Sequence, residues 1–122
     1  MRNDFTTKEV TKLIGCNKRF IPSLTSKFKD RKKPIWTPKQ KGSRGRASLY
    51  TFEEILMIAC LWNCRKIGLP RDFCKQILTH LKAKQDEDMI IIADNKTFGL
   101  MINIKQVHTL IVLRAATKGI EL

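Results

Sequence analysis

The sequence has few acidic residues. Its 122 residues include 11 Asp and Glu against 24 Lys and Arg, which gives a formal net charge of +13 and a pI of about 10.0. Residues 1–50 contain 14 basic and 3 acidic residues, a net +11, whereas residues 51–81 (4 and 3) and 82–122 (6 and 5) each have a net +1. Such a field attracts polyanions. We therefore expect residues 1–50 to carry a nucleic-acid surface.

Long hydrophobic runs are also missing. The longest apolar run, Ile55–Trp62, is far shorter than the roughly 18 residues that a membrane-spanning helix needs. The first residues lack the apolar segment of a signal peptide. We expect a soluble, cytoplasmic, nucleoid-associated protein that makes no contact with a membrane.

Motifs typical of catalytic and metal sites are absent from the sequence. There is no glycine-rich phosphate loop, nucleophile motif or pair of carboxylates in a catalytic arrangement. Cys60 and Cys64 lie one helical turn apart, but in an almost wholly apolar segment, which favours core cysteines over metal ligands. His80 and His108 lack ligand spacing to the cysteines, so a zinc site has little support. We expect reduced thiols, no enzyme activity, no metal and no cofactor.

The N-terminal segment predicts two short helices. Thr6 and Glu9 form a capping box at the start of the first, and Gly15 ends it. A second helix follows the short turn that contains this glycine, which is the arrangement of a helix-turn-helix. Pro22 leaves two placements open for the second helix. It begins near Ile21 with the proline in its first turn, which we favour, or it begins earlier and is kinked.

Residues 29–50 predict a β-hairpin wing. Two β-prone stretches, Ile35–Thr37 and Ser48–Tyr50, flank a tip that is rich in glycine and cations. A disordered basic loop is the alternative. Trp36 and Tyr50 oppose it, because large aromatic side chains need a surface on which to pack.

Two further helices follow the wing. Thr51 and Glu54 form a second capping box ahead of a long apolar segment, and Gly68 ends this central core helix. Pro70 begins a fourth helix that packs back on the third. The polar residues 82–88 then predict a linker. We therefore expect a first domain at residues 1–81 and a second element at residues 89–122.

The second element predicts a hairpin and a helix. Met89–Ala93 and Leu100–Ile104 are β-prone runs, and Val107–Ala116 predicts the final helix. Both strands are apolar at almost every position, so a two-stranded hairpin leaves one face uncovered. Pairing with a second chain would cover it, and we expect residues 89–122 to form a homodimer.

Two stretches carry a resemblance to a known family. They are Phe5-Thr6-Thr7-Lys8-Glu9-Val10 with Leu13-Ile14-Gly15-Cys16-Asn17, and Arg46-Ala47-Ser48-Leu49-Tyr50-Thr51-Phe52-Glu53-Glu54-Ile55 with Arg65-Lys66-Ile67-Gly68-Leu69. In their order, residues 5–81 resemble the DNA-binding domain of the MerR family. The resemblance implies a mainly α fold with small β, a winged helix-turn-helix. Residues 89–122 depart from the family, because they are unlike the long coiled-coil helix of its regulators. Effector sensing therefore does not carry over from the resemblance, and no small-molecule effector is evident.

The expected partner is double-stranded DNA. A recognition helix enters the major groove with its N-terminal end foremost, and a wing contacts the backbone or the minor groove. The recognition-helix candidates are Asn17, Lys18, Arg19, Ser23, Thr25 and Lys27. The wing candidates are Lys39, Lys41, Arg44 and Arg46.

The function we favour is a sequence-specific transcriptional regulator that binds an inverted repeat as a homodimer. One alternative is an architectural factor similar to the excisionases, which would bend DNA without repressing a promoter. A second is an adaptor whose C-terminal part docks another protein, and such a protein would be a monomer in isolation.

Overall fold

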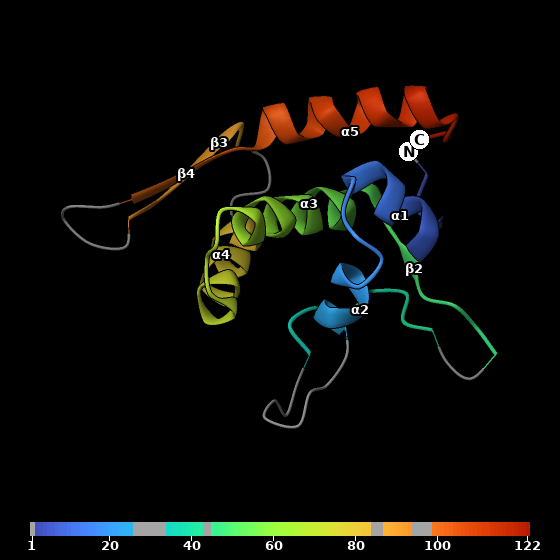
Figure 1. Ribbon diagram of the computed structural model, residues 1–122, viewed down its shortest axis with the longest axis horizontal. Coiled ribbons are helices and arrows are strands. Elements are labelled where there is room, and N and C mark those ends of the chain that lie inside the picture. The colour runs from blue at the N-terminus through green and yellow to red at the C-terminus, as the bar shows by residue number, and fades with distance from the viewer. Residues whose placement is uncertain (1, 26–33, 43–44, 84–86, 94–98) are drawn as a thin grey trace.

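Five helices and two short antiparallel sheets make up the described part of the chain (Figure 1). The computed structural model describes residues 2–25, 34–42, 45–83, 87–93 and 99–122. The expected class, mainly α with small β, is confirmed. No helix within these ranges is both long and apolar enough to cross a membrane.

The first capping box begins helix α1 (Thr7–Ile14), as predicted. The Glu9 N–H donates to the Thr6 hydroxyl at 3.2 Å, and the Thr6 N–H donates to the Glu9 carboxylate at 3.1 Å. Gly15 ends the helix in the left-handed region, at φ 73°, where its N–H donates to the Thr11 carbonyl. This conformation favours glycine, because a side chain is strained there.

Helix α2 (Phe20–Thr25) begins one residue before Ile21. Pro22 is therefore in its first turn, where the missing N–H costs no helical hydrogen bond. The late start is confirmed. Residues 26–28, the rest of the predicted helix, lie outside the described residues.

The predicted pairing of the wing strands is wrong. Strand β2 (Leu49–Tyr50) pairs antiparallel with β1 (Phe5–Thr6), and residues 35–37 form no strand. The Trp36 N–H instead donates to the Leu24 carbonyl at 2.9 Å, so that backbone is held by α2. A single bridge between Gln40 and Leu49 brings the two arms of the segment together.

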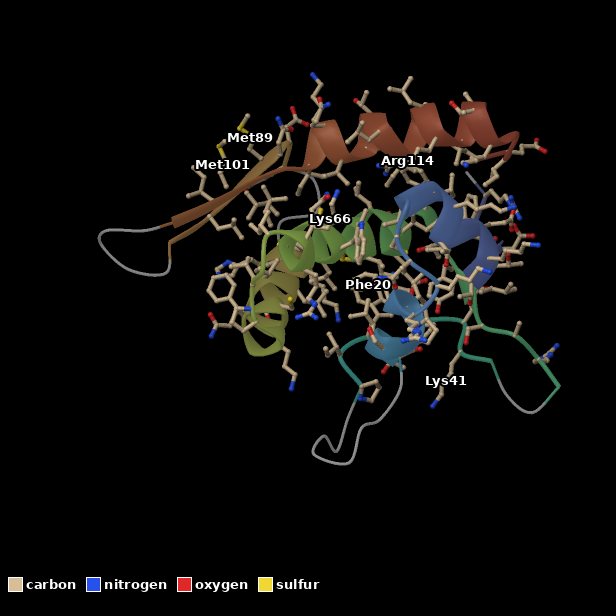
Figure 2. The ribbon with its side chains drawn as sticks, viewed as in Figure 1. Phe20, Lys41, Lys66, Met89, Met101 and Arg114 are labelled. Carbon is tan, nitrogen blue, oxygen red and sulfur yellow. The ribbon has the colours of Figure 1, made fainter. Side chains whose placement is uncertain are left out.

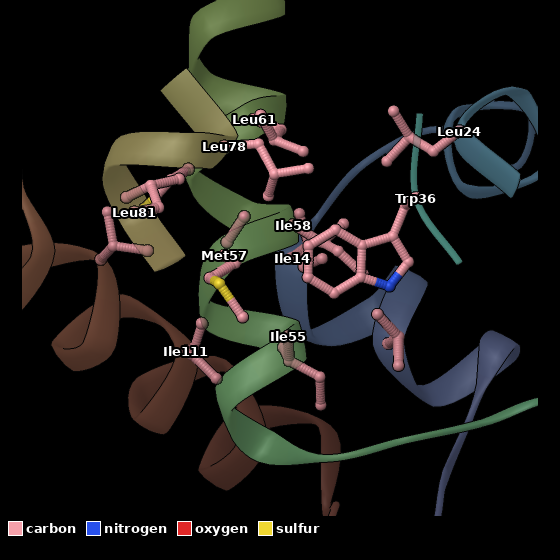
Figure 3. Close-up of a cluster of buried hydrophobic side chains, with 14 of the residues drawn as sticks. Ile14, Leu24, Trp36, Ile55, Met57, Ile58, Leu61, Leu78, Leu81 and Ile111 are labelled. Carbon is pink, nitrogen blue, oxygen red and sulfur yellow. The ribbon is translucent and has the colours of Figure 1, made fainter. Parts of the chain in front are cut away.

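Helix α3 (Phe52–Lys66) is the central core helix, as predicted. The second capping box is present: the Glu54 N–H donates to the Thr51 hydroxyl at 3.2 Å. Helix α4 (Arg71–Ala83) packs back on α3. Buried side chains from other elements surround α3 in Figure 3, where Ile14, Trp36, Leu78 and Ile111 are labelled. The expected burial of the wing aromatics is confirmed, since Trp36 and Tyr50 are both in this core.

The C-terminal hairpin and helix are confirmed with shifted bounds. Strands β3 (Met89–Ala93) and β4 (Gly99–Asn103) pair antiparallel, and helix α5 (Ile104–Lys118) follows directly. The helix starts earlier than expected because the Asn103 side chain caps it, accepting the Gln106 N–H at 3.0 Å. One face of the hairpin is open, with Ile91 67% and Met101 61% exposed.

Helix α5 is packed on the N-terminal part of the chain. It contacts α1 and α3, and its buried Val107, Ile111 and Ala115 belong to the same hydrophobic core as those helices. Arg114 adds a polar connection: its Nη1 donates to the Ile14 carbonyl at 2.7 Å and to the Leu13 carbonyl at 3.4 Å. The last carbonyls of α1 are thus held by a cation from α5.

Candidate nucleic-acid interface

The turn between α1 and α2 presents exposed polar side chains. Asn17, Lys18 and Arg19 are all exposed. The Asn17 side-chain oxygen accepts the Arg19 N–H at 3.1 Å, and its backbone carbonyl accepts the Phe20 N–H at 3.3 Å. Asn17 therefore shapes the entry to α2, and this use occupies its side-chain acceptor.

Two of the predicted contact residues are used within α2 itself. The Ser23 hydroxyl donates to the Phe20 carbonyl at 2.5 Å, and the Thr25 hydroxyl donates to the Ile21 carbonyl at 3.2 Å. Both side chains are half-buried. A contact from either hydroxyl proton to DNA would require exchanging an existing hydrogen bond. Lys27 lies outside the described residues.

Helix α2 rests on the C-terminal half of α3. The rings of Phe20 and Trp62 meet at a centroid distance of 4.8 Å and an interplanar angle of 59°. Beside this pair lies a groove of about 240 Å³, lined by Asn17, Arg19, Phe20, Ser23, Trp62, Arg65 and Lys66. The structure thus brings three predicted contact residues together with Arg65 and Lys66. Arg65 and Lys66 were not among the predicted contact residues.

The wing candidates are placed around the bridge between Gln40 and Leu49. Lys41 and Arg46 line a hollow of about 500 Å³ with Gln40, Ala47 and Leu49. Lys39 is exposed, and its backbone N–H donates to the buried Glu54 carboxylate at 3.2 Å, which ties this segment to α3. Arg44 lies outside the described residues.

Gly42 is required by a close backbone approach inside this segment. A Cβ built at this position would lie 2.6 Å from the Ser48 nitrogen, closer than real side chains approach. The Gly42 N–H also donates to the Ser48 hydroxyl at 2.9 Å. The arms are therefore joined at Gly42 and Ser48 as well as at the bridge.

The cations of this region form no ion pair with an acidic residue that the structure describes. Within the described ranges, the ion pairs are those of Arg2 with Asp4 and with Glu9, both at 2.7 Å. The exposed cations Lys18, Arg19, Lys39, Lys41, Arg46, Arg65 and Lys66 form none with described residues. Helix α2 and the segment around residue 40 lie on the side of α3 opposite α5, and Figure 2 shows Phe20 and Lys41 on that side.

The cysteines of α3 are confirmed as core residues. Cys60 and Cys64 are buried, and burial raises the pKa of the first thiol to about 12 and of the second to about 11. Both are therefore neutral thiols at physiological pH. No cluster of three metal-ligating side chains occurs within the part of the chain that the structure describes.

No protein-family model matches this chain, and no curated protein has a significantly similar sequence.

Proposed function

We propose that this protein binds double-stranded DNA sequence-specifically through a winged helix-turn-helix of the MerR type and acts as a transcriptional regulator. One observation carries the proposal: the turn that precedes α2 and the segment around residue 40 present exposed cations on one side of α3, without acidic partners among the described residues. The phosphates of double-stranded DNA supply the negative charges that such a surface binds.

Within this proposal, the start of α2 approaches the major groove. Lys18 and Arg19 are exposed at that end, and an arginine there is able to pair with a guanine edge. Lys41 and Arg46 contact the backbone beside it and position the protein without reading sequence.

The proposed DNA-binding unit acts as a homodimer through residues 89–122. Its support is the apolar surface at that end: Met89, Ile91 and Met101 are exposed on the hairpin, and Leu113 on α5. Figure 2 shows Met89 and Met101 together, far from Lys41. A two-fold dimer formed there would leave both cationic sides free for the half-sites of an inverted repeat.

Selection from random duplex DNA at stated salt tests this function. We expect enrichment of an inverted repeat. K18A/R19A should then weaken binding to the selected duplex by about tenfold or more, which corresponds to one lost base or charged contact. The matched control is K105A/K118A, which removes the same charge from exposed positions of α5.

Other results of these binding, bending and sedimentation experiments would contradict parts of the proposal. Failure to enrich any sequence, or equal losses in the two double variants, would contradict sequence-specific binding through α2. Bending of bound DNA without repression would favour the architectural alternative. A monomer in sedimentation equilibrium would contradict the homodimer.

A further inference from the structure

We propose that strand β4 is the centre of the homodimer: it pairs antiparallel with β4 of a second copy, and the two hairpins become one four-stranded sheet across a two-fold axis. This pairing rests on the proposed homodimer and specifies it further, because it assigns the contact to one strand edge and to the groove beside it. It requires no DNA.

Strand β4 has one edge that no described strand covers. It pairs with β3 along its whole length, from Gly99 opposite Ala93 to Asn103 opposite Met89, and no third strand joins this sheet within the described ranges. The register is continuous, without a bulge that would twist the edge away. Natural proteins protect such edges with lysine, proline or bulges, and β4 (Gly-Leu-Met-Ile-Asn) contains none of these. Its sequence therefore permits the addition of another strand.

An apolar groove of about 270 Å³ runs beside this edge. The consecutive residues 100–103 of β4 all line it. Successive side chains of a strand point to opposite faces, so a run of neighbours lines one groove only where the groove borders the strand's edge. The other lining residues come from α3 and the start of α5 and include Ile67 and Leu110; none of the described lining residues is charged. A strand added at this edge therefore meets apolar side chains.

The exposed large hydrophobic side chains of the described ranges lie at the same end of the molecule. All of them come from the end of α3, the hairpin or α5: Ile67, Met89, Ile91, Met101, Leu110, Val112 and Leu113. Half-exposed side chains of this size present on the order of 100 Å² each, so this set approaches the roughly 800 Å² that each partner buries in a stable interface. The apolar surface is therefore large enough for a second protein chain.

The distribution of charge favours a second copy of this chain as the partner. The net charge is +13, of which residues 82–122 contribute +1, so two copies repel each other least when these residues meet. An acidic protein or an anionic membrane would instead be attracted to the cations of the N-terminal part. The uncharged groove offers such partners no opposite charge.

The sequence of β4 also suits antiparallel pairing with itself. With the two-fold axis at its central residue, Met101 lies opposite Met101 of the second copy, and Leu100 lies opposite Ile102 of that copy. These are apolar cross-strand pairs with Cβ atoms about 4.5–5.5 Å apart, and no like charges oppose each other. The contact is isologous, so it uses the β4 edge of both copies and closes as a dimer.

Cysteine cross-linking of the full chain tests this pairing. Met101→Cys places a thiol on the axis, where the two opposed Cβ atoms are within reach of a disulfide. Diamide, which takes up the two electrons and two protons of the thiols, should link about half of the chains or more into dimers on a non-reducing gel. Wild type, treated in the same way, gives the background from the native cysteines.

Ile91→Cys is the matched control. Ile91 is the cross-strand neighbour of Met101 and is similarly exposed, 67% against 61%. It lies on the outer strand of the proposed sheet, so the two copies of residue 91 would be about 14 Å apart, at roughly 4.8 Å per strand, beyond the reach of a disulfide. We expect less than about a tenth of the Met101→Cys cross-link.

Three results would overturn the strand pairing. Equal cross-linking of the two variants, or of Ile91→Cys alone, would indicate that the open faces of two hairpins stack instead. No cross-link in either, with a wild-type dimer in sedimentation equilibrium, would assign the dimer to another surface. A wild-type monomer would contradict the homodimer and the pairing together. Cross-linking through residue 101 in a chain that binds no duplex would uphold the pairing and contradict the proposed DNA binding.

Hydrogen exchange of wild type checks the same contact without a substitution. During short labelling times, amides of β4 should exchange at least about fivefold more slowly above the midpoint of dimer formation than below it, because pairing protects the edge. Amides of α4 are the internal control and should change less than about twofold. An equal rate for β4 at both concentrations, in a chain that sediments as a dimer at the higher one, would overturn the pairing.

Discussion

Replacing Arg114 tests how firmly the C-terminal helix holds the N-terminal part of the chain. Arg114→Met keeps most of the aliphatic stem but removes the guanidinium that donates to the carbonyls of Ile14 and Leu13. A hydrogen bond from a charged donor contributes about 1.5–3 kcal/mol. Gly15 beside these carbonyls is exposed, so water is able to replace part of the lost bond. We therefore expect a loss near the lower end, about 2 kcal/mol.

Urea unfolding followed by circular dichroism measures this loss in the free energy of unfolding. In thermal unfolding, a destabilisation of that size should lower Tm by several degrees, at roughly 3–5 °C per kcal/mol for a chain of this length. Lys118→Met is the matched control, because it removes a cation from an exposed position of the same helix. It should cost no more than about 0.5 kcal/mol. Equal stability of the two variants would show that the Arg114 contacts do not hold α5 to α1.

Three further predictions follow from the same structure. Gly15→Ala should cost about 1–2 kcal/mol in urea unfolding because φ is positive there, and an unchanged midpoint would contradict the left-handed cap. The guanidinium of Arg2 lowers the pKa of Glu9, so the stabilisation by the Glu9 carboxylate is fully present above the ordinary pKa of a glutamate and is lost as pH falls through the lowered one. Glu9→Gln should therefore be less stable than wild type at pH 7, and the difference should shrink progressively as pH falls below that ordinary value; a difference that stays constant with pH would refute this. Native Cys60 and Cys64 should react with a thiol reagent at pH 8 at least about tenfold more slowly than in urea, because burial raises the pKa of both thiols; similar rates would contradict their burial.

The parts of the fold that were predictable depend on residues close together in the sequence. A capping box involves two residues three positions apart, so Thr6 with Glu9 and Thr51 with Glu54 located the starts of α1 and α3. The start of α2 was predictable for the same reason, since the geometry of Pro22 restricts only its own turn.

The pairing of the wing was not predictable in this way. Ile35–Thr37 has the composition of a strand, but a strand needs a partner with free backbone groups. The Trp36 backbone N–H donates instead to the Leu24 carbonyl, and its indole N–H donates to the Glu54 carboxylate at 3.2 Å, so this residue is held by α2 and α3. The partner of β2 is β1, more than forty residues earlier in the chain, and no local pattern identifies it.

In the candidate site, too, the features that depend on the local sequence were predictable, and those that depend on contacts between distant residues were not. The distribution of charged residues along the sequence located the cationic region, because counting charges requires no knowledge of which residues are in contact in the fold. It could not include Arg65 and Lys66, which lie in a segment of nearly balanced charge and fit equally well the ordinary end of a helix. The contact between Phe20 and Trp62 places that helix end beside α2, and it joins residues more than forty positions apart in the sequence. A cation's distance along the chain from a recognition helix is therefore a poor guide to its distance from the DNA that the helix would bind.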